Sequence, residues 1–457
     1  MQVDTIAAVS TAPGVGAVAM VRLSGPCAGS ILRRLAPRLG ALPEPRRVTL
    51  VELRDPADGS RLDEVLATYF AGPESYTGED VVEISCHGGW LVPEMIADAC
   101  VRAGARRADP GEFTRRAYLN GKVDLVQAEA VADLIESRSR ASHRAALTQL
   151  ERGLSVRVNG LRDALVKLEA LLVHHIDFPE EDEPPVPVAR VVDVASALLP
   201  DIDALLATAP GGELLREGAL AVLAGRPNAG KSSLYNALIG EERAIVTEEP
   251  GTTRDALITA VELGGFPFRL VDTAGLREGG ERVERLGIEV TRRYLERADV
   301  VLLCVPADAE ESASESGFLE QVQGVPVLWL ETKADVASAF DAPAPRGIDR
   351  VADRLRISVV TGEGIDALKT TLTRLVYGGV VTLGPDAPVL TRVRQRRALE
   401  TARAEIDAFV SALRDGLPAE VASSHLRAAE TALEDLLGAI STETVLDAVF
   451  REFCVGK

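Results

Sequence analysis

A G-x-x-x-x-G-K-S motif at residues 225–232 constrains the fold of this chain more than any other stretch. It follows the apolar run 220–224 and precedes a helix-forming stretch at 233–238. A strand, a glycine-rich turn and a helix in this order form a nest of backbone N–H groups, which binds polyphosphate at the helix N-terminus. The motif therefore predicts a phosphate-binding loop inside an α/β domain.

The residue types inside this loop suit nucleotide phosphates. Gly225 and Gly230 permit turn dihedrals and a close backbone approach that a side chain would block. Lys231 supplies a positive charge for the β- and γ-phosphates, and the Ser232 hydroxyl is a ligand for Mg²⁺. The residues expected to contact the phosphates are Asn228, Ala229, Gly230, Lys231, Ser232 and Ser233.

The rest of the chain is organised around this domain. With 457 residues, the chain is too long for one ordinary core. We predict an N-terminal α/β domain at 1–118, a helical domain split between 119–215 and 379–457, and an inserted α/β domain at 216–378. Glycine pairs at 211–212 and 378–379 stand near the two joins.

The fold class is thus α/β plus α, with a doubly wound parallel sheet in the inserted P-loop domain, because apolar strands alternate with helices there. Its strands are expected at 220–224, 260–263, 268–272, 300–305, 325–330 and 355–358. Outside it, strands are expected at 5–9, 15–23, 48–53, 64–70 and 81–86, and helices at 32–39, 90–103 and 189–208.

Composition and charge exclude several classes of protein. No apolar run is long enough to span a membrane, and the N-terminus lacks the order of a signal peptide. The five cysteines are odd in number and form no C-x-x-C pair, which favours a reducing, cytoplasmic location without a zinc or disulfide framework.

The net charge of −19 repels nucleic acid, so any RNA contact needs a local basic patch. Two arginine groups are candidates, with a solvated helix face as the simpler interpretation of each: Arg392, Arg394, Arg396 and Arg397, and Arg102, Arg106, Arg107, Arg115 and Arg116.

Three further stretches indicate which nucleotide binds. Residues 272–275 read D-x-x-G after an apolar strand, so Asp272 is expected to hold Mg²⁺ through water and the Gly275 N–H to reach the γ-phosphate. Thr253 lies between this motif and the phosphate loop, where a threonine is expected to close over Mg²⁺. Residues 332–335 read T-K-A-D, and the Asp335 carboxylate can accept two N–H bonds that guanine offers and adenine does not.

These elements together predict GTP as the nucleotide. The expected Mg²⁺ ligands are Ser232, Thr253 and Asp272. The remaining expected nucleotide contacts come from the D-x-x-G motif, the T-K-A-D motif and the stretch after the last strand, namely Asp272, Thr273, Ala274, Gly275, Thr332, Lys333, Asp335 and Ser358.

The sequence departs from common GTPase patterns. Thr332 stands where the base-reading motif usually begins with Asn; its hydroxyl can still bond the phosphate loop, and a lower affinity is expected. Residues 358–360 read Ser-Val-Val where Ser-Ala-Lys is usual. Leu276 follows the D-x-x-G glycine and cannot align a water, and no arginine is clearly placed as an internal finger. Asn228 could offer its carbonyl oxygen to a monovalent cation instead; a simple cap of the turn is the other interpretation.

The motifs taken together resemble the MnmE (TrmE) family of tRNA-modifying GTPases over essentially the full length of the chain. The N-terminal stretches that carry this resemblance are 5–8, 16–25, 76–80, 87–89 and 110–122. The others are 225–232, 251–255, 272–278 and the terminal Phe-Cys-Val-Gly-Lys at 453–457. Generic GTPases have neither the long 110–122 segment nor the Cys-x-Gly-Lys ending.

The resemblance implies a folate-binding and dimerising N-terminal domain, a helical domain and an inserted GTPase domain. It implies K⁺-stimulated hydrolysis when two GTPase domains meet, with K⁺ in the place of an arginine finger. The implied K⁺ ligands are Asn228, Thr247, Glu249 and Thr252, of which Thr247 and Thr252 also contact GTP. Glu284 is the implied water-orienting acid, so that the implied catalytic residues are Glu284, Lys231, Asn228 and Thr253.

The resemblance also implies 5-formyltetrahydrofolate on Arg22, Glu79, Lys122 and Lys457. Each of these residues alone would be interpreted as a surface ion pair. The implied partners are a second copy of the chain, an FAD-containing flavoprotein of the MnmG/GidA type and tRNA, whose wobble uridine would be modified at C5. Cys454 is interpreted as a packed tail residue, because no base is visibly adjacent.

Two other functions stay open at the level of the sequence. One is a regulatory GTPase switch in ribosome assembly without modification chemistry. The other is a folate-dependent one-carbon enzyme that uses GTP only for assembly. The residues themselves support nucleotide hydrolysis, whereas RNA chemistry rests on the resemblance.

Overall fold

The computed structural model describes residues 4–177, 187–241, 258–272, 293–307, 318–319, 322, 324–336, 351–383, 387–439, 443–451 and 453–456. The chain divides into two compact units. One unit joins Met1–Ala132 to Glu434–Lys457, and the other is Asp133–Leu433. The four-part division expected from the sequence stays a prediction.

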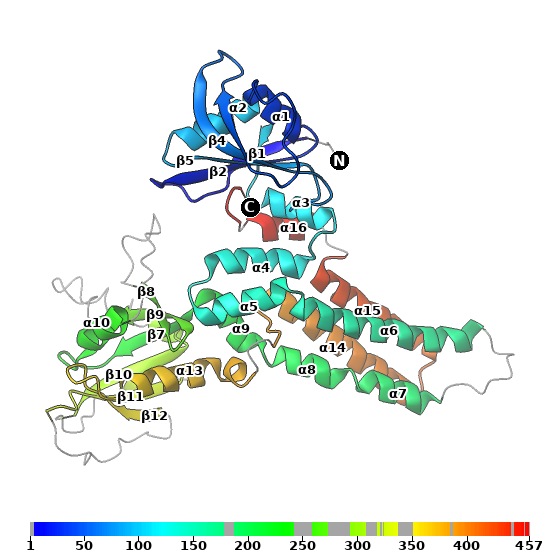
Figure 1. The fold of residues 1–457 in the computed structure, drawn as a ribbon. Coiled ribbons are helices and arrows are strands. Elements are labelled where there is room, and N and C mark those ends of the chain that lie inside the picture. The colour runs from blue at the N-terminus through cyan, green and yellow to red at the C-terminus, as the bar shows by residue number, and fades with distance from the viewer. Residues whose placement is uncertain are drawn as a thin grey trace. The chain divides into compact units, whose positions relative to one another are not determined.

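The N-terminal unit is built on a six-stranded sheet with the order β3-β4-β5-β2-β1-β6 (Figure 1). Neighbouring strands are antiparallel except β1 and β6, which are parallel. The five strands expected in this part are confirmed within a few residues. Their bounds are β1 (Ile6–Val9), β2 (Val18–Ser24), β3 (Thr49–Arg54), β4 (Arg61–Phe70) and β5 (Val81–His87), with the short β6 (Arg106–Arg107) added.

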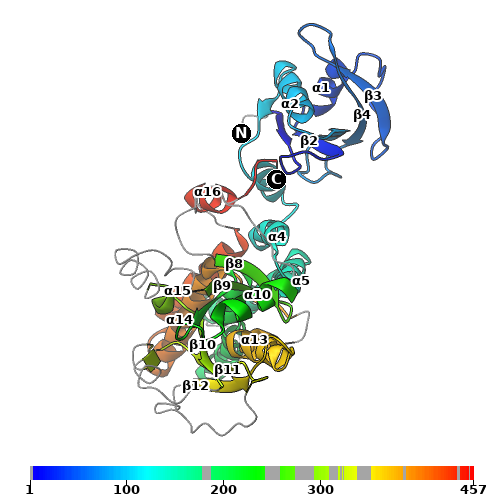
Figure 2. The same ribbon diagram turned by 90° about the vertical axis from the view of Figure 1, so that its left-hand side faces the viewer.

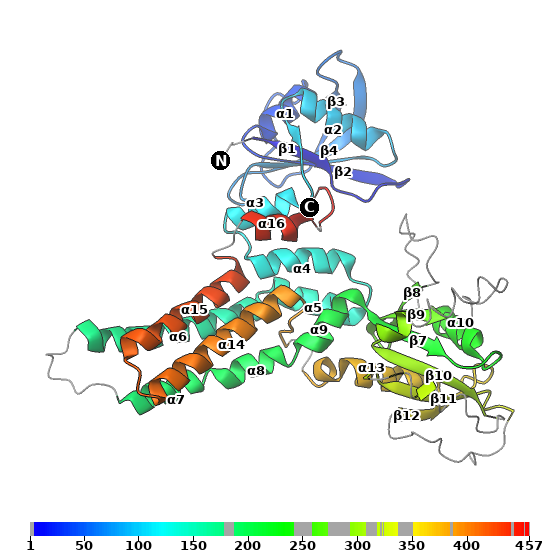
Figure 3. The same ribbon diagram turned by 180° about the vertical axis from the view of Figure 1, so that it is seen from behind.

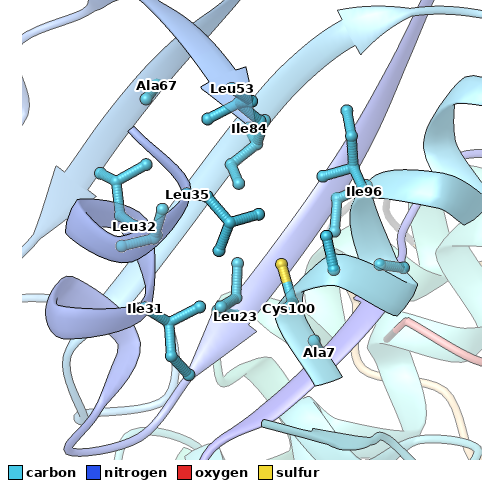
Figure 4. Close-up of a cluster of buried hydrophobic side chains, with 14 of the residues drawn as sticks. Ala7, Leu23, Ile31, Leu32, Leu35, Leu53, Ala67, Ile84, Ile96 and Cys100 are labelled. Carbon is cyan, nitrogen blue, oxygen red and sulfur yellow. The ribbon is translucent and has the colours of Figure 1, made fainter. Parts of the chain in front are cut away.

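Helices α1 (Ala28–Leu35) and α2 (Val92–Arg102) cover one face of this sheet and form its core (Figure 4). Leu35 and Leu23 lie between the two helices and the strands in this view. The helix expected at 32–39 was misplaced by about one turn. It ends at Leu35 because Ala36 (φ −116°, ψ 71°) precedes Pro37, and proline disfavours the helical conformation in the residue before it.

The C-terminal tail folds into the N-terminal unit beside α3 (Glu112–Leu119) and α4 (Leu125–Glu136). Phe450 of α16 (Glu443–Arg451) and Phe453 pack with Leu125 in one apolar cluster. The backbone of Val455 bridges to Pro110, so the tail forms part of this unit.

The helices of the second unit include a bundle in which long elements run side by side (Figure 3). One helix was expected at 189–208, but the structure has two, α7 (Val188–Ser196) and α8 (Leu199–Leu206). Pro200 lies in the first turn of α8, where it lacks an N–H donor and starts a new helix instead of continuing the previous one. Further described helices of this unit are α5 (Arg140–Leu150), α6 (Gly153–Asp177), α9 (Ala209–Glu217), α14 (Val393–Arg414) and α15 (Ala419–Leu437).

The second unit also holds a six-stranded sheet with the order β12-β11-β10-β7-β9-β8 (Figure 2). The predicted parallel sheet is confirmed for five strands, whereas the edge strand β8 pairs antiparallel with β9. The bounds are β7 (Ala219–Ala224), β8 (Ile258–Leu263), β9 (Phe266–Asp272), β10 (Val300–Pro306), β11 (Val327–Thr332) and β12 (Val351–Arg356).

Buried side chains lie on both faces of this sheet, as a doubly wound fold requires. On one face they come from α10 (Lys231–Glu241) and α13 (Ile365–Val381). The last strand is expected at 355–358, but β12 begins about four residues earlier. It is an edge strand and carries polar residues such as Asp353, so its first residues do not form the apolar run that predicts a strand.

Two glycines of α9 let it pack closely on neighbouring segments of the same unit. A Cβ at Gly211 would lie 2.7 Å from a methyl of Val380, and one at Gly212 would lie 2.1 Å from the carbonyl oxygen of Leu390. The pair thus has a packing role in a helix, whereas the sequence marked it only as near a join. Among the described helices, none is long and apolar enough to cross a membrane.

Candidate functional site

The phosphate loop follows β7 in a conformation that only glycine can supply at one position. Gly225 has φ of 136°, and a Cβ there would lie 2.3 Å from the carbonyl oxygen of Cys304 on the neighbouring strand β10. Gly230 has φ of 85°, and Asn228 also has a left-handed φ, 63°. The loop therefore has the tight turn that a nest of N–H groups requires.

Lys231 lies across this loop at the start of α10. Its Nζ donates hydrogen bonds to the carbonyl oxygens of Gly225 (2.9 Å) and Arg226 (2.7 Å), and the residue is buried. Ala229 is buried, whereas Asn228 and Ser233 are exposed. The ammonium charge, the exposed amide and the helix N-terminus are thus gathered at one loop, as phosphate binding requires.

Two of the predicted Mg²⁺ ligands meet in the structure. The Ser232 hydroxyl at the start of α10 donates to Oδ2 of Asp272, the last residue of β9, at 2.7 Å. A hydroxyl and a carboxylate are oxygen donors of the kind that Mg²⁺ takes, usually with waters and phosphate oxygens completing its shell. In the part of the chain that is described, no group of three or more His, Cys, Asp or Glu is arranged to hold a metal alone. The pair fits an ion that the nucleotide helps to bind.

The base-reading residues lie at the end of β11 and just after it. Oγ1 of Thr332 donates to the carbonyl oxygen of Ala229 in the phosphate loop at 2.7 Å. Oγ of the fully buried Ser358 donates to Oδ1 of Asp335 at 2.6 Å. This hydrogen bond lowers the pKa of Asp335. The carboxylate is therefore ionised and held in place, and Lys333 is exposed with a left-handed φ of 59°.

Several expected site residues lie outside the described part of the chain. They are Thr247, Glu249, Thr252, Thr253, Thr273, Ala274, Gly275, Glu284 and Lys457. Of the expected nucleotide site, the structure thus describes the phosphate loop, the Mg²⁺ pair and the base-reading end, which lie at the carboxyl ends of β7, β9 and β11.

Of the three described residues of the expected folate site, Glu79 lies within residues 72–80 of the N-terminal unit, and Arg22 and Lys122 contact this loop. Arg22 forms an ion pair with Glu83 at 2.8 Å, and its guanidinium lies 5.6 Å from the ring centroid of Tyr76 and 5.8 Å from that of Phe113. Nζ of Lys122 donates to the carbonyl oxygen of Pro73 at 2.9 Å.

Glu79 is held by two residues that the sequence did not connect with it. The Ser24 hydroxyl donates to one of its carboxylate oxygens at 2.6 Å, and Arg116 pairs with it at 3.1 Å. Ser24 lies two residues after Arg22 on β2 and therefore on the same face, which is a signal that could have found it. Arg116 lies in the 110–122 stretch, where the sequence indicates only a run of basic residues and not a partner for Glu79.

The arginine group around residues 102–116 does not form an open basic patch. Each of its members is paired with at least one carboxylate of the same unit, as Arg106 is with Asp4 and Glu112. The other pairs are Arg102 with Asp55, Arg107 with Glu94 and Asp98, Arg115 with Asp447, and Arg116 with Asp4, Glu79 and Glu112. In the second group, Arg392 pairs with Asp133 and Arg396 with Glu213 and Glu400. The first group is thus accounted for by ion pairs within its own unit, and RNA contact by either group stays a prediction.

A phosphate loop, a Ser–Asp pair for Mg²⁺ and a tethered carboxylate for the base, all on the carboxyl ends of a mainly parallel sheet, define a P-loop protein of the guanine-nucleotide-binding class. Two family models match the chain: the MnmE helical domain over residues 125–454 and the GTP-binding protein TrmE N-terminus over residues 5–122. The chain belongs to the MnmE family of tRNA modification GTPases.

Curated relatives match along almost the whole chain. The tRNA modification GTPase MnmE of Azoarcus sp. is 44% identical over 99% of this chain and 98% of its own length. That of Myxococcus xanthus is 43% identical, over 99% of each chain. That of Thiobacillus denitrificans is 42% identical, over 99% of this chain and 98% of its own. The solved structure of Aquifex aeolicus Era is 22% identical, over 41% of this chain and 66% of that chain, with a TM-score of 0.29.

Proposed function

We propose that this chain hydrolyses GTP in a K⁺-stimulated reaction that drives tRNA modification. With a flavoprotein partner of the MnmG/GidA type, it would add an aminomethyl or carboxymethylaminomethyl group at C5 of wobble uridine. The observation that carries this proposal is the joint presence of the Ser232–Asp272 pair and the Ser358-tethered Asp335 in a chain of the MnmE family.

The described residues support GTP binding and positive charge at the phosphates, and we propose that Thr253 adds to them. Lys231 and the helix N-terminus supply positive charge where the transferred phosphoryl group carries negative charge. Mg²⁺ held by Ser232, Asp272 and Thr253 would neutralise charge on the phosphate oxygens. Asp335 accepts the two N–H groups of guanine, and the hydrogen bond from Ser358 keeps its carboxylate oriented.

Asn228 suits the role of a K⁺ ligand. Its side chain is exposed on a left-handed turn residue beside Lys231, and an amide oxygen is a ligand that alkali cations accept. We propose that Thr247, Glu249 and Thr252 complete this cage, and that Glu284 orients the attacking water. A positive ion there would supply the charge that the absence of an obvious arginine finger leaves missing, and Glu284 would take the water-aligning role that Leu276 cannot fill.

The test compares GTP hydrolysis in K⁺ and in Na⁺ at equal ionic strength, with and without the flavoprotein. We expect K⁺ to raise kcat by about tenfold or more, equal to a barrier lowered by about 1.4 kcal/mol. Asn228→Ala should remove this advantage and leave GDP affinity nearly unchanged, because the ligand acts in the transition state.

The matched control is Asn159→Ala in α6, whose amide donates to the carbonyl oxygen of Ser155 within its own helix. It should keep the full K⁺ response. Equal rates in the two salts for the wild-type chain would refute the cation proposal, and a large loss of GDP binding in Asn228→Ala would assign that residue to capping the turn.

We further propose that 5-formyltetrahydrofolate binds in the N-terminal unit through Arg22, Glu79, Lys122 and Lys457. A carboxylate can pair with the amidine-like edge of a pterin, and cations with the glutamyl carboxylates. The gathering of Arg22, Glu79 and Lys122 around residues 72–80 supports this proposal. We also propose that the chain acts as a homodimer.

A further inference from the structure

Thr332 connects the two ends of the nucleotide site. It is the last residue of β11, only 4% of its surface is exposed, and Oγ1 donates to the carbonyl oxygen of Ala229 at 2.7 Å. A Cβ at Gly230 would lie 3.5 Å from both Cβ and Oγ1 of Thr332, so the phosphate loop packs directly on this side chain. The hydroxyl therefore ties the base-reading segment to the phosphate loop.

This tie uses the only proton that the side chain can donate. A threonine hydroxyl has one O–H donor, whereas an asparagine amide has two N–H donors. N7 of a purine is an acceptor and needs a donor. An asparagine at this position could give one N–H to the Ala229 carbonyl and the other to N7, but Thr332 has none left once it bonds the loop.

The guanine-specific contact does not depend on Thr332. Asp335 stands three residues further along and is oriented by Ser358, which is fully buried. Its carboxylate contacts a different edge of the base, because it accepts the N–H groups of the Watson–Crick edge, whereas N7 lies on the Hoogsteen edge. Loss of the N7 contact thus weakens the hold on a purine without changing the choice between guanine and adenine.

We propose that Thr332 sets the affinity for the base rather than its identity, because it keeps the loop tether and gives up the hydrogen bond to N7. The chain then reads the Watson–Crick edge of guanine through Asp335 without a hydrogen bond to N7, and it releases guanine nucleotides faster than an otherwise identical site with asparagine. This inference rests on the proposed GTP binding and adds which hydrogen bonds hold the guanine base.

The test uses GDP and 7-deaza-GDP, in which a C–H replaces N7, with the full-length protein. Affinity is measured by calorimetry and release by stopped-flow fluorescence. We expect the wild-type chain to bind the two nucleotides with equal affinity. Thr332→Asn should bind GDP about tenfold more tightly, release it about tenfold more slowly, and prefer GDP over 7-deaza-GDP by the same factor, as one added hydrogen bond predicts.

Two conservative variants separate the tether from the base contact. Thr332→Ser keeps the hydroxyl and should behave as wild type toward both nucleotides. Thr332→Val keeps the shape but cannot donate to Ala229, so it should weaken GDP and 7-deaza-GDP equally. A role in packing alone would leave Thr332→Val at wild-type affinity.

The outcomes distinguish this inference from the proposed function. A tenfold loss of wild-type affinity for 7-deaza-GDP relative to GDP would overturn the inference while leaving GTP binding intact. A folded Thr332→Asn protein that binds both nucleotides as the wild type does would also overturn it. Binding of neither nucleotide by the wild-type chain would overturn the proposed function itself.

Discussion

At the scale of single residues, Arg116 shows how the fold gives a side chain a role that its neighbours in sequence do not suggest. Its side chain is 12% exposed, and its guanidinium pairs with Asp4, Glu79 and Glu112. Burial disfavours the charged form, but the hydrogen bonds and the surrounding carboxylates outweigh it and raise the pKa of Arg116. The residue is therefore a charged clamp on Glu79.

Replacing Arg116 by Gln should weaken the N-terminal unit and the proposed folate site together. We expect a loss of about 2 kcal/mol in unfolding free energy, because charge-assisted hydrogen bonds to partly buried carboxylates disappear. Folate affinity, measured by calorimetry, should fall because Glu79 is no longer oriented. Arg107→Gln is the control, since Arg107 pairs with Glu94 and Asp98 at a more exposed position.

The same variant has a pH signature. Burial alone would raise the pKa of Glu112, but hydrogen bonds from Arg106, the Asp109 backbone and Arg116 outweigh it and lower that pKa. A carboxyl with a lowered folded-state pKa adds stability that is fully present above its ordinary pKa of 4.5 and is lost as pH falls below that value through the folded-state pKa. In the Arg116→Gln variant, the melting temperature should therefore fall less steeply with decreasing pH than in the wild type. An unchanged slope of melting temperature against pH would mean that Arg116 does not act on Glu112.

Sequence reasoning was strong for residues fixed by local motifs and weak for partners that the fold brings together. The loop tether by Thr332 is expected from the T-K-A-D motif, and the structure confirms it. Ser232 and Asp272 are expected at one Mg²⁺ site from the phosphate-loop and D-x-x-G motifs, and the structure brings the two side chains into contact. The Glu79–Arg116 pair spans separate elements, and no periodicity in the sequence links them. Long-range pairing of this kind depends on the register of strands and helices that only the folded chain defines.

At the scale of elements, the sequence predicts the positions of apolar strands well and the ends of helices less well. The strands of both sheets are found where apolar runs predicted them, apart from the polar edge strands β12 and β6, of which the two-residue β6 was not predicted. Helix limits were less accurate because prolines reset them, as Pro37 does after α1 and Pro200 does at α8. The close packing of α9 could not be read from the sequence, since a glycine pair can mark either a loop or a tight helix contact.

This packing predicts unequal effects of alanine at two helical glycines. Gly212→Ala places a methyl 2.1 Å from the Leu390 carbonyl and 2.6 Å from Val389 Cγ1, so backbone must move. We expect a loss of about 1–3 kcal/mol in urea unfolding, as in overpacked cores. Gly378→Ala in α13 is the control, because no atom lies within 4 Å of its Cβ position and alanine favours a helix by about 1 kcal/mol. Equal effects of the two changes would contradict this account of α9.

At the scale of the whole molecule, the proposed homodimer requires an interaction surface. In the N-terminal sheet, Leu50 on the edge strand β3 pairs with Leu66 on β4, and both are exposed, by 63% and 46%. Their neighbours Val51 and Val65 point to the opposite face and are buried in the core. Leu66 pairs with Ser85 on β5, and Ser85 pairs with Met20 on β2. Val18 lies two residues before Met20 on the same strand and is 64% exposed.

A second copy of the chain is the partner that the dimer proposal assigns to this apolar row. Asp at both Leu50 and Leu66 would bury charge in such an interface, so the double variant should sediment as a monomer where the wild type sediments as a dimer. Val421→Asp in α15, at a position that is 55% exposed, is the control and should stay dimeric. If K⁺ is captured only when two GTPase domains meet, the monomeric variant should also lose the K⁺ advantage at dilute concentration and regain part of it when concentrated. A double variant that stays dimeric would exclude this row as the interface, and one that is monomeric yet fully K⁺-stimulated at every concentration would exclude the need for a pair of chains.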